Sequence, residues 1–176
     1  MVYTLQSGDI LPCELTALMS GIVLDTKNFT IRVSSSTFEA AAFLRSRGAD
    51  PVEVKRLFQS DFDQTVRRYH IIERAQVYRD TIALTAEERE VSRALAGQAA
   101  DELLGIDGIS TSFVLFRQPD GIYISARSIG QINVQLLLEP LGGGGNAATA
   151  GAQLRGMDMP MAKKELIRAI DRYFET

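Results

Sequence analysis

The sequence contains one cysteine, Cys13, and one histidine, His70. A single cysteine cannot form a disulfide within the chain, and a zinc site built from cysteine and histidine needs several such residues. Both kinds of site are therefore excluded, and any metal site would have to use carboxylates. The shortage of cysteine also favours a reducing, cytoplasmic setting.

The chain also lacks a long apolar run and an excess of basic charge. No segment approaches the roughly 18–20 consecutive apolar residues of a membrane span, and the first residues, MVYTLQSGDILPCE, lack the basic start and apolar core of a signal peptide. The 19 basic and 22 acidic residues give a net charge of −3, so no general basic field is available for long nucleic acid or an anionic membrane. We therefore expect neither to bind this chain directly.

What the sequence does contain is an ordinary globular composition, with 176 residues of which 45% are hydrophobic and 23% are charged. Residues 1–60 predict helices with little strand, and residues 61–80 predict a connecting helix. Residues 81–176 alternate strand and helix, which indicates an α/β domain able to fold alone.

Several local patterns predict where elements begin and turn. Thr85-Ala86-Glu87-Glu88 is typical of a capping box that opens a helix. The strands expected at 110–117 and 122–125 are joined by Pro119-Asp120-Gly121, which is a hairpin signal. Residues 160–174 predict the last helix.

The strongest local signal for a binding site is the run Gly142, Gly143, Gly144 and Gly145. Glycine permits positive φ and exposes backbone N–H groups, so this loop could wrap an anion or a planar ligand closely. The small residues after it predict a helix over about 147–154, whose first turn would add a positive dipole. A flexible linker is the alternative, although such linkers usually mix glycine with serine and charged residues. We favour a loop that holds phosphate or nucleotide.

A second candidate is the pair Arg127 and Ser128, which lies between an expected strand and an expected helix, fifteen residues before the glycine run. A guanidinium and a hydroxyl at such a point can both be directed at an oxyanion. Ser128 could equally cap the following helix, so the pair alone is a weak signal.

Two further titratable residues, Asp25 and His70, stand out in the sequence. Asp25 ends the apolar helix expected over residues 17–24, where a buried carboxylate needs a partner. That partner could be a hard cation, Lys27, Arg32 or a helix cap, and the residues alone favour a structural partner. His70 is interpreted as a partly buried packing residue.

Three of these stretches together resemble the DHH phosphoesterase superfamily. The segment GIVLDTKNF, which contains Asp25, and the segment TFEAAAFLRSRGAD resemble the end of the catalytic DHH domain. The segment RSIGQINVQLLLEPLGGGGNAATAGAQ, which begins at Arg127, resembles the core motif of the DHH-associated substrate-binding domain. Within the superfamily the chain is most similar to the membrane-anchored cyclic-di-AMP phosphodiesterases of Gram-positive bacteria, and the similarity covers nearly its whole length.

The resemblance implies a fold, an activity and a set of site residues. The fold would be α/β: a DHH-associated domain with a mixed sheet and flanking helices over 81–176, a connecting helix over 61–80, and a mainly helical DHH remnant over 1–60. The family hydrolyses cyclic di-AMP to linear pApA with two Mn²⁺ ions, which generate hydroxide and clamp the phosphoryl oxygens. By the resemblance, Asp25 is the last metal-ligand aspartate, and the pair Arg127 and Ser128 contacts substrate together with the glycine run. The parent protein would be anchored in the cell membrane with this part in the cytoplasm.

Two departures from the family pattern limit what the resemblance implies. The sequence contains no Asp-His-His triplet, and one carboxylate cannot hold two metal ions, so we expect a C-terminal fragment that does not hydrolyse substrate alone. Asn146 follows the glycines where the family usually has histidine. Asparagine donates and accepts hydrogen bonds but cannot be cationic, so phosphate recognition would be altered or weaker.

Other functions remain open at this point. A short linear oligonucleotide or 3′-phosphoadenosine phosphate would use the same chemistry and the same Arg-Ser and glycine elements. In a different class, the chain could be a non-catalytic module that forms a homo-oligomer through an exposed apolar surface. Adenine stacking would need an aromatic face, for which Tyr123 and Phe116 are the candidates.

Overall fold

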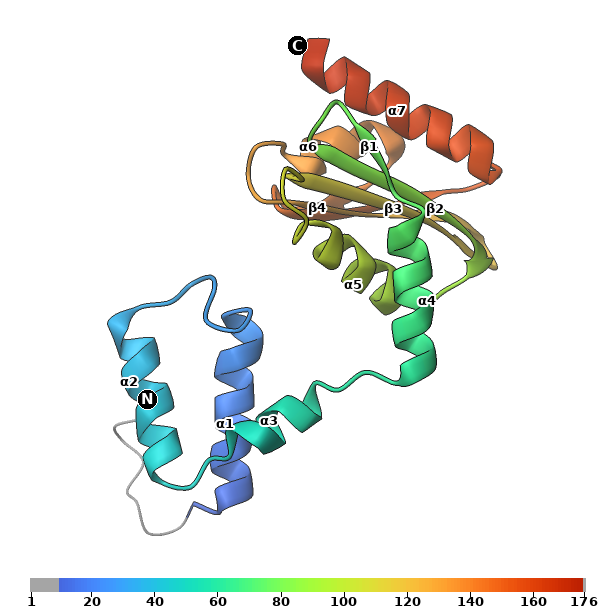
Figure 1. Cartoon of the computed structure of the whole chain (residues 1–176). Coiled ribbons are helices and arrows are strands. Elements are labelled where there is room, and N and C mark those ends of the chain that lie inside the picture. The colour runs from blue at the N-terminus through green and yellow to red at the C-terminus, as the bar shows by residue number, and fades with distance from the viewer. Residues whose placement is uncertain (1–9, 176) are drawn as a thin grey trace. The chain divides into compact units, whose positions relative to one another are not determined.

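The chain divides into two compact units, Met1–Ser60 and Asp61–Thr176, of which the computed structural model describes residues 10–175 (Figure 1). We describe each unit by itself. Within the described residues, no helix is long and apolar enough to cross a membrane.

Over residues 10–60, the described part of the first unit contains three helices, α1 (Pro12–Asp25), α2 (Ser35–Ser46) and α3 (Pro51–Leu57). Proline suits the first helical position because it has no N–H to leave unpaired, and α1 and α3 both begin with it. The Asp50 carboxylate caps α3 by accepting the Val52 N–H at 2.9 Å. The buried hydrophobic residues of this unit form one small cluster: Leu15, Met19, Leu44, Ala49 and Val54.

The second unit is a six-stranded mixed sheet with helices on both faces, which confirms the predicted fold class. Its elements are α4 (Phe62–Glu73), β1 (Gln76–Tyr78), β2 (Ile82–Glu90), α5 (Arg93–Leu103), β3 (Thr111–Gln118), β4 (Gly121–Ser128), α6 (Val134–Leu138), the 3₁₀ turn η2 (Glu139–Leu141), β5 (Gly144–Gly145), β6 (Thr149–Leu154) and α7 (Met159–Glu175). The strand order is β1-β2-β3-β4-β6-β5. Only β2 and β3 pair in parallel, and α5 is the crossover between them.

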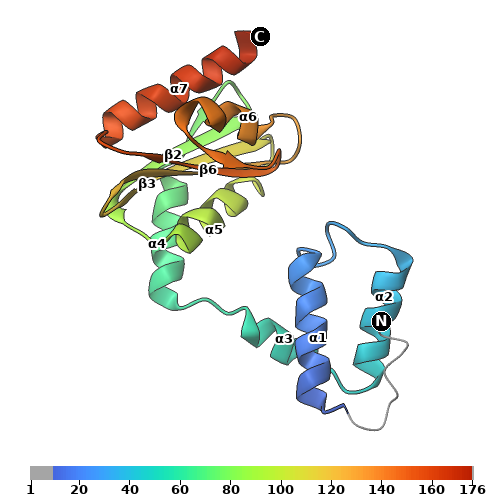
Figure 2. The ribbon, with the colours of Figure 1, turned by 180° about the vertical axis from the view of Figure 1, so that it is seen from behind.

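Each face of this sheet has its own core. Figures 1 and 2 show α4 and α5 against one face and α6 and α7 against the other. Along β4, Ile122, Ile124 and Ala126 are buried in the cluster that also contains residues of α6 and α7. Tyr123 is buried in the cluster on the α5 side. Alternate residues of a strand point to opposite faces, so the two clusters define the direction of every β4 side chain.

Two of the expected helix starts are wrong. Residues 85–88 lie within β2, and the helix that follows begins at Arg93, where the Ser92 hydroxyl accepts the Leu95 N–H. The predicted helix over 147–154 is strand β6. Its alternate residues Ala150, Ala152 and Leu154 are buried, so the period is that of a strand. The hairpin at Pro119–Gly121 is confirmed, since Gln118 pairs with Gly121.

Candidate functional site

Sheet pairing brings two of the sequence-predicted features together. Arg127 lies near the end of β4, opposite Thr149 of β6. The glycine run enters β5, which pairs with the other edge of β6 through Gly144–Gly151 and Gly145–Ala150. Arg127 and the glycine run are therefore separated by one strand, although they are distant in sequence.

The glycine run forms a tight turn and the first strand of a hairpin, and three of its four residues are required by the backbone. Gly142 has φ +74° and Gly145 has φ +147°, where a side chain would be strained. A Cβ on Gly143 would lie 2.7 Å from the Gly151 carbonyl oxygen and 2.8 Å from the Leu138 Cβ. Gly144 alone has open space around the position of a side chain. The run is therefore a built hairpin, in contrast to a flexible linker.

Asn146 closes this hairpin with its own side chain. Its Oδ1 accepts the N–H groups of Ala148 at 3.0 Å and Thr149 at 2.9 Å, and its N–H donates to the Thr149 carbonyl at 2.7 Å. These N–H groups are used inside the turn, and no helix begins here, so the predicted dipole contribution to an anion site is wrong. A role of Asn146 in binding stays a prediction.

Arg127 is held on the α5 face of the sheet. Its Nε donates to Asp101 Oδ1 at 3.1 Å, and its Nη1 donates to Ser125 Oγ at 3.1 Å and to the Ala126 carbonyl at 3.0 Å. The Arg127 side chain is 17% exposed. Such charge-assisted hydrogen bonds hold a guanidinium in one orientation, so Arg127 presents a fixed positive charge beside β6.

Ser128 does not share this site with Arg127. Neighbouring residues of a strand point to opposite faces, and the buried Ser128 hydroxyl oxygen accepts the Gly130 N–H at 3.1 Å. It therefore stabilises the turn after β4. The structure does not direct the two side chains at one oxyanion.

A strip of bare backbone lies beside Arg127 on the same face. Ala150 and Ala152 are buried on the opposite face, so Gly151 between them belongs to the α5 face, as does its β5 partner Gly144. We call these two residues the glycine strip. Because neither has a side chain, a planar or bulky ligand could approach the sheet here and reach the Arg127 guanidinium.

The two aromatic candidates for adenine stacking are wrong, because both are in the core. Phe116 is 2% and Tyr123 is 7% exposed. The Tyr123 ring lies between the Phe116 ring, with centroids 5.8 Å apart, and the Arg93 guanidinium, 4.5 Å from its centroid. Its hydroxyl donates to Asp120 at 2.8 Å, and this bond, with a second from Gln153, holds the pKa of Asp120 below its usual value.

Asp25 lies in the first unit as the last residue of α1. Its side chain is 72% exposed, and its Oδ1 is 3.6 Å from Arg32 Nη1, one of the structural partners considered for it. Within residues 10–175, no group of three or more His, Cys, Asp or Glu side chains could hold a metal ion. A metal-binding role for Asp25 stays a prediction that needs ligands from elsewhere. His70, predicted as partly buried, is exposed beside Glu73, with Nδ1 3.4 Å from Oε2.

Sequence reasoning missed the residues around Arg127, namely Gly97, Asp101, Ser125 and Gly151. One signal was available, because Gly97 stands inside the alanine-rich stretch RALAGQAADEL, where glycine disfavours a helix. The other contacts depend on which strand pairs with which.

Comparison with known proteins places this site in a recognised domain. The DHHA1 domain family matches residues 80–176. The chain is 46% identical over 165 residues to the cyclic-di-AMP phosphodiesterase PdeA of Listeria monocytogenes and to the cyclic-di-AMP phosphodiesterase GdpP of Geobacillus thermodenitrificans, covering 92% of this chain and 25% of each relative. It thus spans about a quarter of the length of these two relatives.

A solved structure shares the fold over nearly the whole chain. An exopolyphosphatase-related protein from Bacteroides fragilis superimposes with a TM-score of 0.80 at 20% identity, covering 96% of this chain and 52% of that one.

Proposed function

Since this chain belongs to the DHHA1 domain family, we propose that its second unit binds a di-adenylate, and that the chain is the substrate-binding part of a cyclic-di-AMP phosphodiesterase. In the parent protein, cyclic di-AMP would be hydrolysed to pApA. The observation that carries the proposal is the fixed Arg127 guanidinium beside the glycine strip of Gly144 and Gly151. The two relatives at 46% identity, both named cyclic-di-AMP phosphodiesterases, support this choice of ligand.

The two chemical parts of such a ligand match the two parts of the site. A phosphodiester is anionic, and a guanidinium recognises it through charge-assisted hydrogen bonds. A flat adenine or a ribose needs room against the backbone, which Gly144 and Gly151 leave. Exposed Thr149, opposite Arg127 in the register, adds a hydroxyl at the same edge.

Hydrolysis in this proposal depends on metal ions, Mn²⁺ by preference, most of whose ligands lie outside the described residues. The residues described here do not fit a resident metal centre, because Asp25 is exposed and paired with Arg32 and no carboxylate cluster lies near it. We therefore assign this chain the binding of substrate and derive no catalytic step through the metal. Asp25 is proposed to contribute one ligand once the remaining ligands are supplied.

The proposal extends to the parent protein's location and assembly. We propose that the parent is anchored in the cell membrane and presents this part to the cytoplasm. The first unit exposes large apolar side chains, among them Leu24, Phe38 and Leu57, which would pack against the remainder of the catalytic domain. If they instead pair two copies of this chain, light scattering will show a dimer whose fraction rises with concentration.

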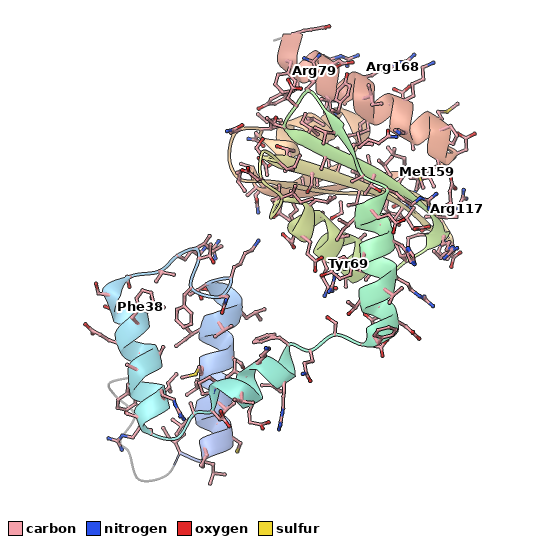
Figure 3. All side chains as sticks on the ribbon, viewed as in Figure 1. Phe38, Tyr69, Arg79, Arg117, Met159 and Arg168 are labelled. Carbon is pink, nitrogen blue, oxygen red and sulfur yellow. The ribbon has the colours of Figure 1, made fainter. Side chains whose placement is uncertain are left out.

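Calorimetric titration of the 176-residue chain, with metal chelated by EDTA, tests the proposal. Cyclic di-AMP and pApA should bind, and 3′-phosphoadenosine phosphate should bind more weakly. Arg127→Ala should weaken binding at least tenfold, since it removes a charged hydrogen-bond donor. Arg117→Ala is the control, because Arg117 is an exposed arginine on the same β3–β4 hairpin, paired with Glu88 at the opposite end (Figure 3).

Two outcomes would count against this function. A folded chain that binds neither dinucleotide would overturn it. A clear preference for 3′-phosphoadenosine phosphate would overturn the choice of substrate and assign the chain to the phosphatase alternative.

A further inference from the structure

Gly97 of helix α5 leaves room for the Arg127 guanidinium. A Cβ on Gly97 would lie 2.9 Å from Arg127 Nη2, well inside van der Waals contact. Gly97 does not have a positive φ, so its backbone does not require glycine, and the residue is buried inside a helix of alanines that would suit alanine better. Glycine at this position is therefore explained by the space that it leaves for the Arg127 guanidinium.

Asp101 holds the same guanidinium one helical turn further along α5. Residues four apart lie on one face of a helix, so Gly97 and Asp101 both face the Arg127 guanidinium from α5. Asp101 Oδ1 accepts the Nε–H at 3.1 Å, while Ser125 and the Ala126 carbonyl hold Nη1. Two of the three guanidinium nitrogens are thus used to fix its orientation.

The third nitrogen, Nη2, remains for a ligand. Over the part of the chain that the structure describes, Nη2 donates no hydrogen bond, and it lies over Gly97. A carboxylate this close to an anion site reduces the attraction for phosphate. Asp101 is therefore unfavourable as a group that binds phosphate. Its role here is to fix the orientation of the Arg127 guanidinium.

We infer that Gly97 and Asp101 are positioning residues that orient Arg127 so that Nη2 meets the phosphodiester of the bound dinucleotide. The inference rests on the proposed function and adds to it the two residues that determine where the phosphate lies. Neither Gly97 nor Asp101 touches the ligand in this account.

Two substitutions of Asp101 separate its charge from its hydrogen bond. Asp101→Asn keeps an oxygen that can accept the Nε–H and removes the negative charge, so cyclic di-AMP should bind as tightly as to the wild type or more tightly. Asp101→Ala removes the acceptor and should weaken binding about tenfold. Asp107→Ala, at an exposed aspartate in the loop after α5, is the control and should leave binding unchanged.

Gly97→Ala tests whether the space over Gly97 is needed for the Arg127 guanidinium. The added methyl should displace the guanidinium and weaken binding about tenfold, because a misplacement of about 1 Å is enough to lose such a contact. Gly21→Ala is the matched control, since Gly21 is also a helical glycine but has nothing within 4 Å of the added carbon. Thermal melting of every variant shows which are folded.

A double-mutant cycle distinguishes failure of this inference from failure of the proposed function. In an Arg127→Ala background, Gly97→Ala should have no further effect on binding, and Asp101→Ala should not weaken it further. If both single variants bind like the wild type while Arg127→Ala does not bind, the positioning role is overturned and the function stands. Equal binding by Asp101→Ala and Asp101→Asn overturns the role of Asp101 without depending on Gly97→Ala. If Arg127→Ala itself binds normally, the proposed function fails.

Discussion

The two units of this chain differ in how much apolar surface each can bury. Among its described residues, the first unit has one cluster of five buried hydrophobic residues and leaves Leu24, Phe38 and Leu57 exposed. The second has a separate core on each face of a six-stranded sheet. Small units bury a small fraction of their surface and are correspondingly marginal. The first unit is therefore expected to depend on neighbours, whereas the second is expected to fold and bind ligand by itself.

The largest expected effect comes from removing a core side chain of each unit in turn. Phe113→Ala, at a fully buried position of β3, should lower the free energy of unfolding of the second unit by about 3–5 kcal/mol. Leu44→Ala, also fully buried, should unfold the first unit and leave the second unit's transition unchanged. Hydrogen exchange read by mass spectrometry across a urea series reports each unit separately. A common shift of both units after Leu44→Ala would break the comparison.

The next largest effect tests how tightly the glycine run, residues 142–145, is packed. Gly143→Ala should destabilise the second unit by about 1–3 kcal/mol, because the methyl would meet the Gly151 carbonyl and Leu138. Gly144→Ala, with open space around it, should leave the urea midpoint almost unchanged while weakening dinucleotide binding. Equal midpoints for the two variants would mean that the run is a flexible linker after all.

A smaller effect concerns stability at low pH. It compares the hydrogen-bonded cluster around Asp171 in the second unit with the Asp25–Arg32 ion pair in the first. Tyr78 donates to Asp171 at 2.6 Å and Arg79 donates to it at 2.8 Å. These two hydrogen bonds lower the pKa of Asp171. The stabilisation from a lowered carboxyl pKa is present above the unfolded-state pKa of about 4 and is lost as pH falls through the folded-state pKa.

Asp171→Asn should therefore lower the urea midpoint at pH 7, and the difference from wild type should shrink steadily below about pH 4. Asp25→Asn should change nothing measurable, since the exposed Asp25–Arg32 pair is 3.6 Å apart. A difference for Asp171→Asn that stays constant down to pH 2 would show that the carboxylate's charge is not what stabilises the cluster.

The smallest effect is a stabilisation of the first unit. Gly21 lies inside α1 with nothing near the position of a Cβ. Gly21→Ala should raise the helix's stability by about 0.5–1 kcal/mol, because glycine is the more flexible residue in the unfolded chain. The effect should appear as slower amide exchange in α1 and nowhere in the second unit.

Features set by a few neighbouring residues could be predicted from the sequence, whereas the pairing of strands could not. The turn at Pro119–Gly121 was predicted correctly because its signal lies within a few residues. The small residues over 147–154 permit a helix, but pairing of β6 with β4 and β5 decides their conformation. Tertiary packing outweighs local propensity at such positions.

The candidate site shows the same division. Arg127 and the glycine run could be singled out as chemistry, but their proximity depends on β6 lying between them. Arg127 and Ser128 are neighbours in sequence and were therefore predicted to act as a pair. Side chains alternate between the two faces of the sheet along β4, so the two point to opposite faces. The roles of Gly97 and Asp101 could not be predicted from the sequence, because their contacts with Arg127 join α5 to β4.

The central claim is that the second unit binds a di-adenylate through Arg127 without metal. Its most direct test is calorimetric titration of the wild-type chain and Arg127→Ala with cyclic di-AMP in EDTA. The account predicts saturable binding of one ligand per chain by the wild type and loss of at least tenfold in affinity in the variant. Equal affinity of the two folded proteins, or no binding by the wild type, would contradict it.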